Sequence, residues 1–160
     1  SNVDDKENFS EIIGALEKIG EDIQLVFPIH PRAEKTAKSF GLYERLKAIP
    51  NIVLTGPVGY LDFVALMSNS KMALTDSGGL QEETTALGIP CITLRENTER
   101  PITVTEGTNT IVGCDPELIL KTAYEVLEGK GKAGRIPDLW DGKTSSRIAD
   151  VILQYIENGD

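Results

Sequence analysis

A serine and two adjacent glycines, Ser77, Gly78 and Gly79, separate a short apolar run from a helical pattern. Glycine has no Cβ, so backbone N–H groups beside it can approach a ligand closely. The first turn of a helix adds unpaired N–H donors and the positive end of the helix dipole. The pattern therefore predicts a phosphate-binding turn over residues 76–79, followed by a helix over 80–87.

Three side chains near this turn have competing assignments. The Ser77 hydroxyl can cap the helix or bind the anion, but it cannot easily do both. Either Glu82 or Glu83 could accept hydrogen bonds from the two hydroxyls of a ribose, since both lie beyond the predicted phosphate. A purely structural turn, with both glutamates favouring the helix N-terminus, has equal weight on spacing alone.

Cationic side chains follow two of the predicted strands, at the sheet edge where open α/β proteins bind ligands. His30 and Arg32 offer donors to an anion, although a histidine between two prolines can also serve as a helix cap or turn residue. Arg95 and Arg100 lie in a polar loop over 95–101. This loop either closes over a phosphate or forms surface ion pairs, with equal weight.

Phe63 belongs to an apolar stripe on a predicted helix whose first turn lies beside the same edge. The ring of either Tyr60 or Phe63 could lie against a flat base, but a stripe of this spacing is more often part of the core.

The elements that must position these residues alternate along the chain, which predicts an α/β fold with a doubly wound parallel sheet. Ile148, Val151, Ile152 and Tyr155 of the last helix are expected to pack against that sheet. Strands are predicted at 23–29, 51–55, 72–74, 90–94 and 110–113, and helices at 4–20, 34–49, 60–69, 80–87, 117–128 and 146–157.

Composition narrows the function classes. A length of 160 residues suits one domain over 1–160. The formal charge of −9 argues against a nucleic acid or an anionic membrane as partner, because both require a basic face. The chain has no apolar run of ~18 residues. Cys91 and Cys114 are expected to be buried free thiols in a reducing cytoplasm, and one histidine makes a structural metal site improbable.

The sequence closely resembles the carboxyl-terminal half of the non-hydrolysing UDP-N-acetylglucosamine 2-epimerases. The resemblance covers nearly the whole chain, and the run Asp-Ser-Gly-Gly-Leu-Gln-Glu-Glu followed by Thr-Glu-Arg-Pro is its most specific part. The matching motifs lie at residues 27–31, 60–63, 75–83, 87–90 and 95–101.

The resemblance implies one Rossmann-like half of a two-domain GT-B enzyme, with UDP held by this half. The full-length enzyme is implied to be a cytoplasmic homodimer. His30 and Arg32 are implied to belong to a regulatory or substrate-binding site, although some members have His-x-Asn-Pro at that point. The resemblance implies that Ser77, Gly78 and Gly79 bind the diphosphate and that Glu83 binds the ribose. It also implies that Phe63 contacts the uracil region and that Arg100 supports the phosphate side.

The family's implied reaction interconverts UDP-N-acetylglucosamine and UDP-N-acetylmannosamine. The C2 proton is removed, UDP leaves, and UDP adds back with the opposite configuration at C2, without a cofactor or metal. The catalytic carboxylates are implied to belong to an amino-terminal half, because only Asn2 and Val3 could remain of the family's His-Arg-x-Glu-Asn run. The fragment alone is thus expected to be inactive.

Two other functions fit the residues. A GT-B glycosyltransferase half would share the architecture and the acidic ribose ligand, and it would form no C2 epimer when given UDP-N-acetylglucosamine without an acceptor. A non-enzymatic nucleotide-sugar sensor would require a gene that encodes no catalytic half.

Overall fold

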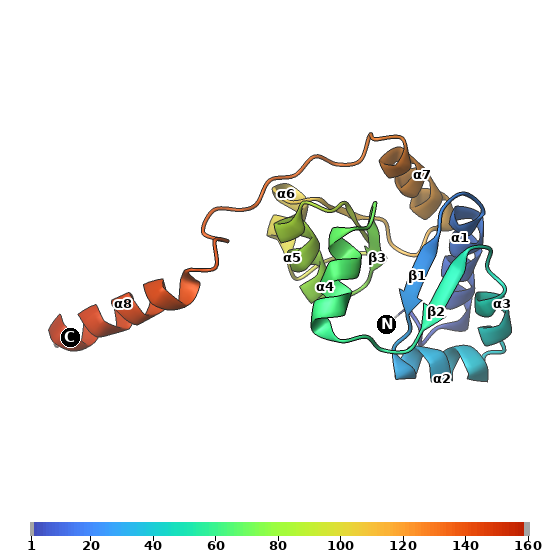
Figure 1. Ribbon diagram of the computed structural model, residues 1–160, viewed down its shortest axis with the longest axis horizontal. Coiled ribbons are helices and arrows are strands. Elements are labelled where there is room, and N and C mark those ends of the chain that lie inside the picture. Colours follow the sequence, from blue (N-terminus) through green and yellow to red (C-terminus); the bar gives the residue numbers. More distant parts are fainter. Residues whose placement is uncertain (1, 159–160) are drawn as a thin grey trace.

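The computed structural model describes residues 2–158, in which short strands alternate with helices (Figure 1). The alternation and the predicted strands are confirmed, with bounds that shift by up to two residues. The strands are β1 (Leu25–Pro28), β2 (Ile52–Thr55), β3 (Ala73–Thr75), β4 (Cys91–Thr93) and β5 (Asn109–Ile111). The helices are α1 (Lys6–Asp22), α2 (Pro31–Ser39), α3 (Tyr43–Lys47), α4 (Tyr60–Ser68), α5 (Gly78–Leu87), α6 (Pro101–Thr105), α7 (Pro116–Leu127) and α8 (Thr144–Asn158).

The strands pair in parallel within two hydrogen-bonded groups. One group is β1 beside β2, and the other has β4 between β3 and β5. Thr75, Thr93 and Ile111 end their strands in register with one another. The loops that follow them therefore leave from a single edge of the sheet, where the sequence predicts the ligand site.

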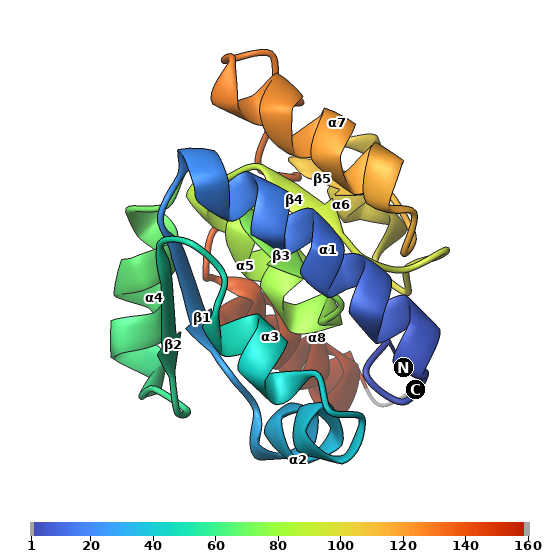
Figure 2. The same ribbon diagram turned by 90° about the vertical axis from the view of Figure 1, so that its right-hand side faces the viewer.

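Helix α1 connects the two groups of strands by contributing to both hydrophobic clusters of the core. Phe9 and Ile13 pack with α2, α3 and the strands β1 and β2. Ile12 and Ile19 pack with β4 and α7. Figure 2 shows α1 lying across the strands with α7 beside it, and the two helices are in contact. This packing follows from the helical spacing of apolar residues in α1.

Helix α5 packs against β3, β4 and β5. Because successive strand residues point to opposite faces, Ile92 joins the cluster with α1 and α7 while Cys91 and Thr93 share the other face. That other face carries polar groups, since Gln81 of α5 and Asn109 of β5 are both fully buried. A polar layer therefore lies on the side of the sheet that meets α5.

Two predicted segments, the helix over 34–49 and the loop over 95–101, differ from the observed secondary structure. The single helix predicted over 34–49 is two helices, because the chain turns at Gly41, which has a φ of +72° that favours glycine. Helix α2 also begins earlier, at Pro31, which suits the first helical turn. The loop over 95–101 ends in the unpredicted helix α6, which starts at Pro101.

The prediction that the last helix packs against the sheet is wrong. Helix α8 extends away from the rest of the protein after an extended segment (Figure 1). Its residues Ile148, Val151, Ile152 and Tyr155 are 52–67% exposed. The spacing of these residues correctly predicts an amphipathic helix, but an apolar stripe does not specify what covers it.

Candidate functional site

The strand β3 leads into the N-terminus of α5 through two residues, Asp76 and Ser77. Ser77 is the N-cap in extended conformation (φ −87°, ψ 126°), and its side chain makes no capping hydrogen bond. The helix begins at Gly78, two residues earlier than predicted. Both glycines therefore lie in the first helical turn, where backbone N–H groups have no partner within the helix.

Backbone donors at this turn are available to a ligand. The Ser77 N–H donates to Thr75 Oγ1 at 3.0 Å, but the N–H groups of Gly78, Gly79 and Leu80 make no hydrogen bond to residues 2–158. Gly79 is exposed, and Gly78 is half-buried. The turn thus has three open donors, a free serine hydroxyl and the positive end of a ten-residue helix.

The two neighbouring glutamates have different surroundings. Glu82 Oε1 lies 2.9 Å from Arg100 Nε, in a half-exposed ion pair. Glu83 is half-buried, and its carboxylate has no ion pair or hydrogen bond within the described part of the chain. Glu83 is therefore the carboxylate left able to accept hydrogen bonds from a ligand.

The loop after β4 carries both Arg95 and Arg100, for which the sequence left open either a surface ion pair or a contact with phosphate. Arg95 forms a two-pronged pair with Glu99, whose oxygens lie 2.9 and 2.8 Å from Nη1 and Nη2. The hydrogen bonds from Arg95 lower the pKa of the Glu99 carboxyl. A Cβ on Gly78 would lie 3.9 Å from Arg100 Cγ and 4.0 Å from Glu99 Oε2, so the Arg100 side chain and the Glu99 carboxylate both lie beside the turn. Both arginines thus form ion pairs, Arg95 with Glu99 and Arg100 with Glu82, and the Arg100 side chain lies within contact distance of Gly78.

A buried polar network connects this loop to α5, and sequence reasoning missed it. The Gln81 side chain is fully buried, and its Oε1 accepts hydrogen bonds from Thr98 Oγ1 at 2.5 Å and Asn109 Nδ2 at 3.1 Å. The available signal was an amide residue at a sheet-facing helix position and another inside a short strand. Neither is usual in a core unless it is hydrogen-bonded.

His30 and Arg32 lie at the carboxyl end of β1. His30 is the N-cap of α2, and its Nδ1 accepts a hydrogen bond from the Arg32 N–H at 3.2 Å. The Arg32 guanidinium pairs with Asp4 at 2.7 Å. The capping role is therefore observed for His30, whose side chain is exposed.

Phe63 is half-buried in the first turn of α4, where its N–H donates to Gly59 O at 2.9 Å. Helix α4 packs against α5, so the ring comes from a neighbour of the helix that carries the turn. Phe63 is not among the side chains that pack against either core cluster.

A hollow of about 470 Å³ opens beside Asp76, within the range typical of small-molecule sites, but Ser77, Gly78 and Gly79 do not line it. It is lined by loops after three strands and by the start of the chain. Gly113, with a φ of +64°, allows Glu96 to approach so closely that any Cβ there would collide with its carboxylate. The lining residues are Asn2, Asn8, Asp76, Arg95, Glu96 and Cys114.

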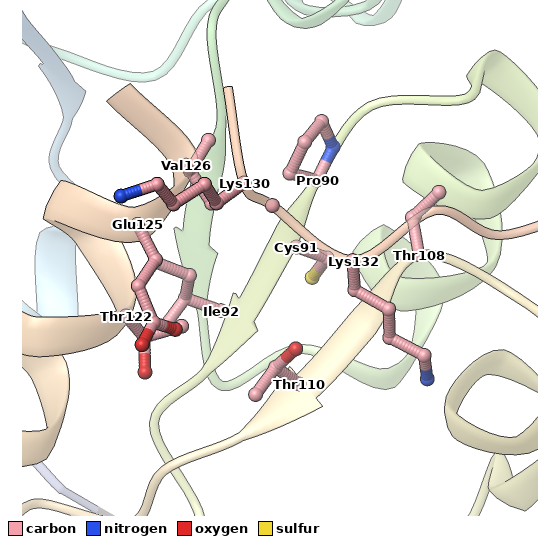
Figure 3. A pocket seen from close by; sticks show the side chains of 11 residues that line it. Pro90, Cys91, Ile92, Thr108, Thr110, Thr122, Glu125, Val126, Lys130 and Lys132 are labelled. Carbon is pink, nitrogen blue, oxygen red and sulfur yellow. The ribbon is translucent and has the colours of Figure 1, made fainter. Parts of the chain in front are cut away.

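A second hollow, of about 180 Å³, lies away from the turn (Figure 3). Pro90, Cys91 and Thr108 of its wall are at the amino ends of β4 and β5. Figure 3 shows Lys132 extending past β5, where its Nζ donates to Asn109 O at 3.0 Å. Burial raises the pKa of the Cys91 thiol, so this free cysteine is protonated and inert at neutral pH.

Between residues 2 and 158, no three histidine, cysteine or acidic side chains are grouped as metal ligands. None of the described helices has the length and apolar character needed to cross a membrane.

Comparison with known proteins gives consistent matches. A family model described as UDP-N-acetylglucosamine 2-epimerase matches residues 1–153. A UDP-N-acetylglucosamine 2-epimerase of Methanocaldococcus jannaschii is 43% identical over 153 residues, which cover 94% of this chain and 41% of the relative. One from Methanococcus maripaludis is 40% identical and covers 84% of this chain and 40% of the relative.

Solved structures agree with these relatives. The crystal structure of the M. jannaschii UDP-GlcNAc 2-epimerase in complex with UDP-GlcNAc and UDP superimposes with a TM-score of 0.86 at 42% identity, over 96% of this chain and 42% of that one. The chain thus spans about two fifths of the length of these relatives. The predicted fold is confirmed: it is the Rossmann-like α/β fold found in one half of a GT-B enzyme.

Proposed function

Since the chain belongs to the UDP-N-acetylglucosamine 2-epimerase family, we propose that residues 1–160 form the UDP-binding domain of such an enzyme. The turn Ser77–Gly79 binds the diphosphate, and Arg100 supports it from the side. Glu83 accepts hydrogen bonds from the ribose hydroxyls, and Phe63 lies against the uracil.

The observation that carries this proposal is that α5 presents both open N–H donors and one carboxylate without a partner in residues 2–158. Within residues 2–158, three N–H groups are unpaired at the start of α5, and the Glu83 carboxylate is unpaired about one turn further along. A nucleoside diphosphate presents its charged group and its diol at a comparable separation. The net charge of −9 does not oppose this arrangement, because local backbone dipoles neutralise the diphosphate.

In the proposed reaction a base removes the proton from C2 of the sugar, and the C–H electron pair forms a double bond between C1 and C2. The C1–O bond breaks, and UDP leaves with its electron pair. A proton then reaches the opposite face of C2 as a UDP oxygen attacks C1 again. This chain holds UDP through the intermediate, because a lost leaving group would make the overall reaction a hydrolysis.

The proton chemistry is assigned to the part of the longer protein that lies outside this chain. The relatives are more than twice as long, which leaves room for a second domain that closes over the sugar. The whole enzyme is proposed to be a cytoplasmic homodimer that uses no cofactor or metal. His30 and Arg32 are proposed to belong to a regulatory or substrate-binding site at the end of β1.

Isothermal titration calorimetry of the chain with UDP tests the proposal. Saturable binding is expected, and Ser77→Ala should weaken it about tenfold to a hundredfold, because the mutation removes one hydrogen bond to a charged group. Ser39→Ala is the matched control, since its hydroxyl bonds only to Thr36 O on the surface of α2. Absence of UDP binding by the wild-type chain would refute the proposed function.

A second assay on the full-length enzyme separates the reaction classes. Supplied with UDP-N-acetylglucosamine and no acceptor, an epimerase forms the C2 epimer and exchanges the C2 proton with solvent. A glycosyltransferase forms neither product, so proton NMR in heavy water distinguishes the two.

A further inference from the structure

We propose that Thr98 and Gln81 are positioning residues that hold Arg100 beside the diphosphate, through a closed ring of hydrogen bonds between α5, the loop after β4 and β5. This inference rests on the proposed function and adds residues that do not touch UDP themselves.

The ring holds the main chain of Arg100 on both sides. The Arg100 N–H donates to Thr98 Oγ1 at 2.9 Å, and the Arg100 carbonyl accepts from Thr103 Oγ1 at 2.7 Å. Arg100 is itself the N-cap of α6, with a φ of −122° and a ψ of 60° that no helix imposes. Its backbone is therefore fixed by two neighbouring hydroxyl groups.

Both hydroxyls are held in turn by buried amides. Thr98 Oγ1 donates to Gln81 Oε1 at 2.5 Å, and Thr103 Oγ1 accepts from Asn109 Nδ2 at 3.0 Å. Asn109 Nδ2 closes the ring by donating to Gln81 Oε1 at 3.1 Å. Each of the five hydrogen bonds joins one donor to one acceptor, so their directions are mutually consistent, whereas the buried Gln81 Nε2 has no hydrogen-bond partner within residues 2–158.

Burial makes the circuit rigid. Gln81, Thr103 and Asn109 are all 0% exposed, so breaking one of these bonds would leave a polar atom without water to replace its partner. Asn109 Oδ1 also accepts from Thr93 Oγ1 at 2.6 Å, which anchors the circuit to β4. The sheet thereby determines where an exposed arginine leaves the loop.

Gln81 belongs to the same helix that supplies the open donors. It lies one turn after Ser77, and its N–H donates to Ser77 O at 3.3 Å. The next residue, Glu82, forms the ion pair with Arg100. The helix therefore both presents the N–H groups and sets the distance from them to the guanidinium.

The test compares variants of the chain by calorimetry with UDP and with uridine, which lacks the phosphates. Thr98→Val removes both hydrogen bonds of the hydroxyl while keeping the side-chain shape, and Thr98→Ser keeps the hydroxyl. Thr98→Val should weaken UDP binding about fivefold or more, as expected for losing the orientation of a charge-assisted contact. Uridine binding should be unchanged, and Thr98→Ser should restore UDP affinity to within about twofold.

The variant Arg100→Ala shows whether Thr98→Val weakens UDP binding through Arg100. If Thr98 acts through Arg100, adding Thr98→Val to Arg100→Ala should change UDP affinity by less than about twofold. An equal loss in both backgrounds, or an equal loss for uridine, overturns the inference while the proposed function stands. A wild-type chain that binds no UDP overturns both.

Circular dichroism shows whether each variant is folded. Should Thr98→Val unfold the chain, Thr103→Val and Thr103→Ser repeat the comparison from the other side of Arg100. The same pattern is expected there, and an effect of Thr103→Val that is independent of Arg100 would also overturn the inference.

Discussion

Arg100 Nε lies 2.9 Å from the carboxylate of Glu82 and forms an ion pair with it. The next residue, Glu83, forms no ion pair with Arg100. Successive helix residues are about 100° apart, so two adjacent glutamates cannot face the same group. The ion pair distinguishes the two glutamates, because it gives Glu82 a partner within the protein, whereas Glu83 has no hydrogen bond or ion pair among the described residues. The same pair keeps the guanidinium close to the first turn of α5.

The first prediction separates these two glutamates. Glu83→Ala should weaken UDP binding by about 1.5–3 kcal/mol, because a charge-assisted hydrogen bond to the ribose is lost. It should also abolish the preference for UDP over 2′-deoxy-UDP in calorimetry. Glu82→Ala is the matched control and should retain that preference. A preference that survives in Glu83→Ala and disappears in Glu82→Ala would reverse the assignment.

The second prediction concerns Gly78. A Cβ at this position would meet no protein atom closer than 3.9 Å, so Gly78→Ala should fold normally. Alanine in the first turn of a helix should raise the thermal midpoint slightly, since glycine is the poorer helix former. UDP affinity should nevertheless fall about tenfold or more, because the methyl group blocks the close approach of a phosphate. Unchanged affinity would show that the backbone at Gly78 does not contact UDP.

The third prediction concerns pH and the pair that joins α1 to α3. Arg45 Nε and Nη2 lie 2.7 and 2.8 Å from the two oxygens of Glu17, and the hydrogen bonds from Arg45 lower the Glu17 pKa below its ordinary value of 4.5. A depressed carboxyl pKa stabilises the folded state above pH 4.5, and this contribution is lost as the pH falls through the folded-state pKa.

Glu17→Gln should accordingly reduce the free energy of unfolding at pH 7 by about 0.5–1 kcal/mol, a value kept small because the pair is partly exposed to solvent. Urea unfolding at pH 7 and pH 3 measures this difference, which should diminish at the lower pH. A destabilisation of the same size at both pH values would contradict the ionic explanation.

The fourth prediction contrasts two isoleucines on amphipathic helices. Ile119 of α7 is 1% exposed, and Ile152 of α8 is 52% exposed. Ile119→Ala should cost about 2–5 kcal/mol through lost burial and a residual cavity. Ile152→Ala should change the unfolding free energy of this chain by no more than about 0.5 kcal/mol. Denaturant titrations of both variants provide the comparison, and a large effect at Ile152 would mean that α8 packs against the body in solution.

Local sequence was sufficient for several features of this protein. The strand-to-helix junction at Ser77, the parallel strands and the amphipathic helices were predicted because backbone freedom, hydrophobic periodicity and capping depend on residues near one another in the chain. The longer motif over residues 75–83 also indicated the family, which the matches to known epimerases bear out.

Tertiary structure decided what each side chain meets. Sequence could not show that Glu82 pairs with Arg100, or that Gln81, Thr98 and Asn109 share one ring, because these partners lie 17 to 28 residues apart. Nor could it show that the apolar side of α8 is uncovered, since the periodicity of a helix records which face is apolar and not which surface it meets. Hydrogen bonds and packing between distant residues exist only once the chain has folded.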